Sequence, residues 1–79
     1  MTFTEAKESA RAQIGNRIYQ LLEQRGMSQR RLSVEIDVEM AMVNKWINGR
    51  SLPSLPAALA MAQVFGVTVE QLALGEETK

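Results

Sequence analysis

The side chains of this chain that could take part in binding chemistry are amides and the positively charged lysines and arginines, because cysteine and histidine, the usual catalytic groups, are missing. The 79 residues contain no cysteine and no histidine. The first absence excludes a disulfide or a thiolate metal site, and the second removes the usual general base and the commonest zinc ligand. No acidic residues cluster at metal-ligand spacing, and no glycine-rich phosphate loop occurs. The sequence therefore predicts a binding protein, with no enzyme activity, no metal and no cofactor.

The charged residues balance in number but not in position, with nine basic and nine acidic residues in all. Residues 11–50 hold seven basic residues against four acidic ones, whereas residues 51–79 hold one basic and three acidic. Phosphate neutralisation supplies most of the non-specific affinity of a DNA-binding protein, so a net charge of zero is unfavourable. The positive part of the chain nevertheless permits DNA binding.

Two short helices joined by a tight turn are expected in this positive part, over residues 28–49. Each helix has a pair of apolar residues at helical spacing, and so one buried face. The pairs are Leu32 with Ile36, and Val43 with Trp46. Asp37 stands between them, where the chain must reverse, and aspartate tolerates the left-handed backbone of such a turn. This is a helix-turn-helix pattern.

The pattern and its flanks resemble the Cro/repressor-type (XRE family) helix-turn-helix domain of phage repressors and bacterial regulators. The matching residues follow the family's order and spacing over residues 14–72 and are Ile14-Gly15-Asn16-Arg17-Ile18, Gly26-Met27-Ser28-Gln29, Leu32, Lys45-Trp46-Ile47-Asn48-Gly49-Arg50, Pro53-Ser54-Leu55 and Phe65-Gly66-Val67-Thr68-Val69-Glu70-Gln71-Leu72. The resemblance implies an all-α fold, a compact lambda-repressor-like bundle of five helices. It also implies a sequence-specific regulator of transcription, more often a repressor, that binds duplex DNA as a homodimer.

Capping residues divide the chain into five helices. We expect a helix from Thr4, with Glu5 in its first turn, to Arg25, then helices over about 29–36 after Ser28, about 40–48, from Ser54, and from Thr68 with Gln71. Residues 1–13 are an N-terminal extension of the first helix, 14–74 the helix-turn-helix domain and 75–79 a polar tail. In the extension, Phe3, Ala6 and Ala10 are open to three readings: core, dimer contact or a frayed, lightly packed end. Further on, we expect the core to include Leu55, Leu59, Ala62, Phe65, Leu72 and Leu74.

The chain departs from the family at two places. Glu39 stands at the cap of the third helix, where the family usually has serine or threonine, and its side chain is a poor cap. Many members also join the first and third helices by a buried Arg–Glu pair, and the corresponding residues here are Leu22 and Ile47. Because a buried ion pair can be replaced by packed apolar side chains at little cost, we expect these two to touch in the core.

Carried over position by position, the family's base-contacting residues in the major groove are Glu39, Met40, Ala41, Asn44 and Lys45. Lysine can donate to guanine, asparagine can pair with adenine, glutamate can accept from cytosine, and the apolar side chains can meet thymine methyl groups. The phosphate contacts would lie at the start of the second helix and in the loop after the third. They are Ser28, Gln29, Arg30, Asn48, Arg50 and Ser51.

Met40 and Met42 favour a second interpretation, because they make the start of the third helix unusually apolar. An adaptable methionine surface suits contact with a protein partner. The alternative is thus a protein-interaction module on the same fold. Neither interpretation involves a membrane, since no apolar run is long enough to span one, and a cytoplasmic location is expected.

Overall fold

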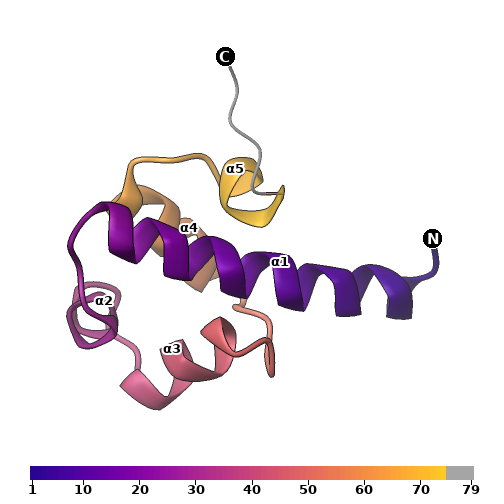
Figure 1. Ribbon diagram of the computed structural model, residues 1–79, viewed down its shortest axis with the longest axis horizontal. Helices are drawn as coiled ribbons and strands as arrows, with labels where there is room; N and C mark the ends of the chain where they lie inside the picture. The colour runs from indigo at the N-terminus through magenta and orange to yellow at the C-terminus, as the bar shows by residue number, and fades with distance from the viewer. Residues whose placement is uncertain (75–79) are drawn as a thin grey trace.

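The computed structural model describes residues 1–74, and the predicted polar tail, residues 75–79, lies outside them. The described chain is all helical: α1 (Phe3–Gln24), α2 (Gln29–Glu35), α3 (Met40–Ile47), α4 (Leu55–Phe65) and α5 (Val69–Leu74). Figure 1 shows α1 crossing the molecule, with α2 and α3 on one side of it and α5 on the other. The predicted five-helix bundle is confirmed.

The N-cap of the first helix is Thr2, two residues before the predicted cap. Thr2 Oγ1 accepts a hydrogen bond from Glu5 N at 3.2 Å, and Glu5 Oε1 accepts one from Thr2 N at 2.9 Å. This reciprocal capping box needs an acid or glutamine three residues after the cap, and Thr4 has Lys7 there instead. The expected start at Thr4 is therefore wrong.

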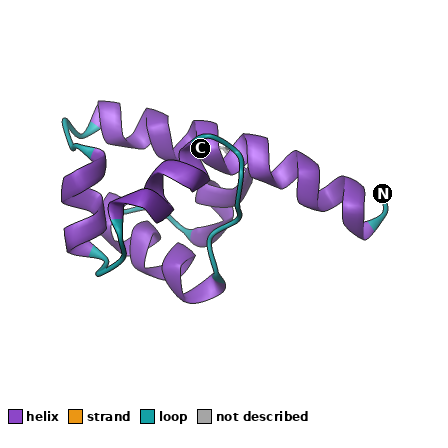
Figure 2. Cartoon of the chain, turned by 90° about the horizontal axis from the view of Figure 1, so that it is seen from below, coloured by secondary structure: helices purple, strands orange, loops and turns teal. Residues whose placement is uncertain are grey.

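The N-terminal part of α1 projects beyond the bundle, as Figures 1 and 2 both show. Phe3 is exposed, while Ala6 and Ala10 are half-buried. Lys7 Nζ lies 5.1 Å from the centre of the Phe3 ring, a cation–π distance. The extension is thus a capped helix in which Phe3 lies outside the core, while a dimer contact stays a prediction.

The core lies between α1 and the four shorter helices. Its buried cluster contains Ile18, Leu21, Leu22, Leu32, Val43, Trp46, Met61, Phe65 and Leu72. Trp46 was expected to be core, and it is. Ile47 packs against the same cluster that contains Leu22, as the replacement of the ion pair requires, although direct contact between the two stays a prediction.

Three leucines expected in the core face outward instead. Leu55 and Leu59 are 66% and 51% exposed, and Leu74, at the end of α5, is exposed too. The buried residues of α4 are Met61, Ala62 and Phe65, which lie on a different side of the helix. Because α4 carries no charged residue, its sequence does not mark an outer face, and the leucines were misassigned for that reason.

Gly15 sets the separation of α1 and α3. A Cβ atom at this position would lie 2.5 Å from the carbonyl oxygen of Trp46 and 2.7 Å from that of Ile47. Real side chains do not tolerate such contacts with backbone, so glycine is needed for the two helices to pack this closely. The family motif included Gly15, but only the packing explains it.

Candidate nucleic-acid interface

The turn between α2 and α3 has the geometry that its sequence predicts. Asp37 has φ +58°, the left-handed conformation expected at the reversal. Ser33, buried in α2, donates a hydrogen bond to the carbonyl oxygen of Arg30 at 2.6 Å. Val38 N donates to the carbonyl oxygen of Ser33 at 2.9 Å across the turn. The first bond lies within α2, and the second ties the turn to the end of that helix.

The helix α3 has one buried and one exposed face. Val43 and Trp46 are buried in the core, and Trp46 Nε1 has no hydrogen-bond partner among the described residues. All five residues predicted to contact bases are exposed: Glu39, Met40, Ala41, Asn44 and Lys45. Four of them recur at positions i, i+1, i+4 and i+5 and therefore share one face. Glu39 stands at the N-cap without a side-chain capping bond, as expected.

A chain of amide side chains connects the N-terminus of α2 to this exposed face. Asn44 Nδ2 donates to Gln29 Oε1 at 3.4 Å. Asn48 Nδ2 donates to both the backbone oxygen and Oδ1 of Asn44, at 3.0 and 3.1 Å. A predicted base contact is thus bonded to two predicted phosphate contacts. Sequence reasoning missed this network, because residues 29 and 44 are brought together only by the turn.

The predicted phosphate contacts lie in two groups. Ser28, Gln29 and Arg30 stand at the start of α2, where Ser28 Oγ caps the helix by accepting from Arg31 N at 3.0 Å. Asn48, Arg50 and Ser51 follow α3, and Arg50 N closes that helix by donating to the carbonyl oxygen of Lys45 at 2.9 Å. Gln29 and Ser51 are partly buried, and the other four are exposed.

The apolar surface at the start of α3 is exposed as well. Met40 and Met42 are 51% and 41% exposed, and in α2 Val34 is exposed too. Val34 was not singled out from the sequence, since a lone valine in a short helix gives no signal of its own.

The family of the chain follows from a comparison with known proteins. A family model described as "Helix-turn-helix" matches residues 18–72, most of the chain. The chain belongs to this helix-turn-helix family. The resemblance to the XRE family is thereby confirmed. DNA binding and transcription regulation are the functions of this kind of domain. Residues 1–17, which include the first fifteen residues of α1, precede the family match.

Among curated proteins, this helix-turn-helix chain is similar to the HTH-type transcriptional activator BcrR of Enterococcus faecalis. The two are 25% identical over 65 residues, which make up 82% of this chain and 32% of the relative. The chain thus matches about a third of the length of that protein. No solved structure matches the chain.

Two further findings concern the described residues, 1–74. None of their helices is long and apolar enough to cross a membrane. No group of three or more acidic, histidine or cysteine side chains among them is placed to hold a metal ion.

Proposed function

We propose that the chain is a sequence-specific regulator that binds duplex DNA with α3 in the major groove. The observation that carries this proposal is the division of α3 into two faces. Val43 and Trp46 anchor one face in the core, while the exposed face presents Asn44 and Lys45. A helix fits the major groove, where each base pair offers a distinct set of donors and acceptors.

Each base-contacting residue has a proposed role. Lys45 donates to guanine, and Glu39 accepts from cytosine. Met40 and Ala41 meet thymine methyl groups. Asn44 pairs with adenine, and its bonds to Gln29 and Asn48 support a second role, which is to hold those two amides in place for phosphate contact.

The two polar groups at the ends of this face are the proposed phosphate clamps. The first consists of Ser28, Gln29 and Arg30, and the second of Asn48, Arg50 and Ser51. Arg30 and Arg50 are exposed and supply the positive charge that phosphates require. Phosphate contacts fix the register of a protein on DNA, while base contacts read the sequence.

We further propose that two copies bind a two-fold symmetric site and that the usual outcome is repression. One small module makes too few contacts for strong specificity, which favours a dimer. Occupying an operator is enough to block transcription, whereas activation requires an additional contact. BcrR is an activator by name, so a reporter assay with the operator upstream of or within a promoter tests the sign directly.

The experiment that tests the function is selection from a random duplex library, followed by binding of the enriched pool at two salt concentrations. An enriched inverted repeat, with affinity that falls steeply as salt rises, is expected. About six phosphate contacts per copy would give a large negative slope of log affinity against log salt. Failure to enrich any sequence would overturn the proposal.

The exposed methionines favour one competing function, a protein-interaction module. Met40 and Met42 supply an apolar surface at the start of α3. Binding through such a surface would be insensitive to salt and would be lost in a Met40→Ser, Met42→Ser variant. Salt dependence therefore separates the two functions.

A further inference from the structure

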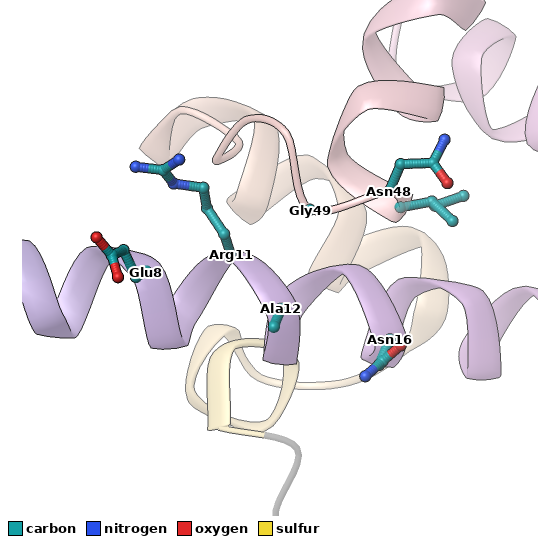
Figure 3. A pocket seen from close by; sticks show the side chains of 7 residues that line it. Glu8, Arg11, Ala12, Asn16, Asn48 and Gly49 are labelled. Atoms are coloured by element: carbon teal, nitrogen blue, oxygen red, sulfur yellow. The ribbon is translucent and has the colours of Figure 1, made fainter.

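A polar groove of about 400 Å³ opens where the first half of α1 passes the end of α3 (Figure 3). Glu8, Arg11, Ala12 and Asn16 line it from α1, and Asn48 and Gly49 line it from the end of α3. Sequence reasoning missed this groove, because its two sides are more than thirty residues apart in the chain.

Close backbone contacts fix the shape of the groove. Gly15, next in the chain to the lining residue Asn16, allows α1 to approach the carbonyl oxygens of Trp46 and Ile47. At its edge, a Cβ atom on Gly49 would lie 3.8 Å from the carbonyl oxygen of Arg11, an ordinary van der Waals distance. Arg11 is therefore held beside the loop that follows α3.

Two opposite charges share this groove. Figure 3 shows the side chains of Arg11 and Glu8 on the same side of α1, the side of the loop after α3. Arg11 forms no hydrogen bond or ion pair with the described residues, although Glu8 is only three residues away. The guanidinium is partly exposed and free to bind an external anion.

We propose that the DNA backbone crosses this groove and that Arg11 binds a phosphate next to the one held by the Asn48–Ser51 loop. The inference rests on the proposed function, since it requires α3 in the major groove. Its support is continuity: Asn48 belongs both to the second phosphate clamp and to the groove wall. The planar guanidinium matches a phosphate with two parallel hydrogen bonds.

Arg11 precedes residues 18–72, the part that matches the family model. The extension of α1 would thus enlarge the DNA contact of this chain beyond the helix-turn-helix itself. Glu8 would lie near the same phosphate and weaken binding, so the two side chains should act with opposite sign.

The test measures the affinity of the full chain for its selected duplex between 50 and 200 mM salt. For each bound copy, Arg11→Gln should weaken binding about tenfold at 50 mM, and that loss should shrink roughly threefold by 200 mM because each lost phosphate contact accounts for a slope of about 0.9. Glu8→Gln should tighten binding. The matched control is Glu70→Gln, which removes one charge from α5, on the opposite side of α1 from α3 (Figure 1).

Ethylation of single phosphates gives a positional readout. Ethylation of the phosphate that Arg11 contacts should interfere with binding of the parent chain. Ethylation of the same phosphate should not interfere with binding of the Arg11→Gln variant. Circular dichroism would verify that each variant keeps its fold. If the parent binds with a steep salt slope and both groove variants match Glu70→Gln, this inference is overturned while the proposed function stands. If the parent fails to bind any duplex, both are overturned.

Discussion

The exposed surfaces of α3 and α4 differ in a way that matters for DNA. Both helices expose large apolar side chains: Met40 and Met42 on α3, and Leu55 and Leu59 on α4. On α3 they stand among amides, a lysine and a nearby arginine, whereas α4 has no charged residue over its eleven positions. Since DNA is bound largely through its phosphates, α3 is suited to it and α4 is not.

The two helices also differ in how clearly a polar side is separated from a buried side. On α3 the polar residues occupy one side and the buried pair the other, so a substitution on each side should have a distinct effect. On α4 the exposed leucines contribute little packing. Comparing substitutions in the two helices therefore separates effects on the free energy of unfolding from effects on DNA affinity.

The largest effect is expected for Trp46→Ala, on the buried face of α3. Loss of a buried aromatic side chain costs about 3–5 kcal/mol of folding free energy, because it removes contacts and leaves a cavity. In α4, Leu59→Ala at an exposed position should stay within about 0.5 kcal/mol. Urea denaturation followed by circular dichroism measures both. Equal losses in the two variants would contradict the assignment of faces.

Gly15→Ala tests the packing of α3 against α1. In an unhindered helix interior, alanine is more stabilising than glycine by about 1 kcal/mol. Here the added Cβ would meet two backbone oxygens, so we expect a loss of about 1–3 kcal/mol instead. The sign of the change in unfolding free energy is the readout, and a stabilised variant would show that the two helices are not so close.

Lys45→Ala and Arg50→Ala compare a base contact with a phosphate contact on the proposed DNA-binding surface. Loss of Lys45 should cost about 1–3 kcal/mol of binding free energy and relax the preference at one base pair. Loss of Arg50 should weaken all sequences alike and flatten the salt slope by roughly one unit. Leu55→Ala in α4 is the control and should bind as the parent does. If either variant binds like the parent at low salt, its proposed role is wrong.

The smallest effect concerns the first turn of α1. In the capping box, hydrogen bonds with Thr2 hold the pKa of Glu5 below its ordinary value of 4.5. The bond from the Thr2 backbone N–H has the larger effect, and the bond with the Thr2 side chain has the smaller one. A lowered pKa means that the carboxylate stabilises this turn above its unfolded-state pKa, and that the contribution is lost as the pH falls through the lowered value. The first turn should then fray in acid while the rest of the chain stays folded.

A pH titration followed by NMR would detect this fraying in the amide signals of Thr2 and Glu5. A midpoint below the ordinary glutamate value is expected. A midpoint at or above 4.5 would contradict the capping box, and a Thr2→Ala variant should move the midpoint back toward that value.

The local chemistry of the sequence determined where the helices lie and how the central turn is made. Ser28, Ser54 and Thr68 cap helices as their types predict, because a cap depends on a side chain and the backbone two or three residues ahead. Asp37 adopts the left-handed turn for an equally local reason. Val43 and Trp46 were assigned to the buried face because two apolar residues three positions apart lie on one side of a helix, and both are buried.

The tertiary structure decided what depends on residues distant in the chain. The buried side of α4 was set by what the helix packs against, since its uncharged sequence offered no preference. The role of Gly15, the Gln29–Asn44–Asn48 network and the groove beside Arg11 all arise where separate helices meet. Local propensity carries no information on such contacts, because they exist only once the chain has folded.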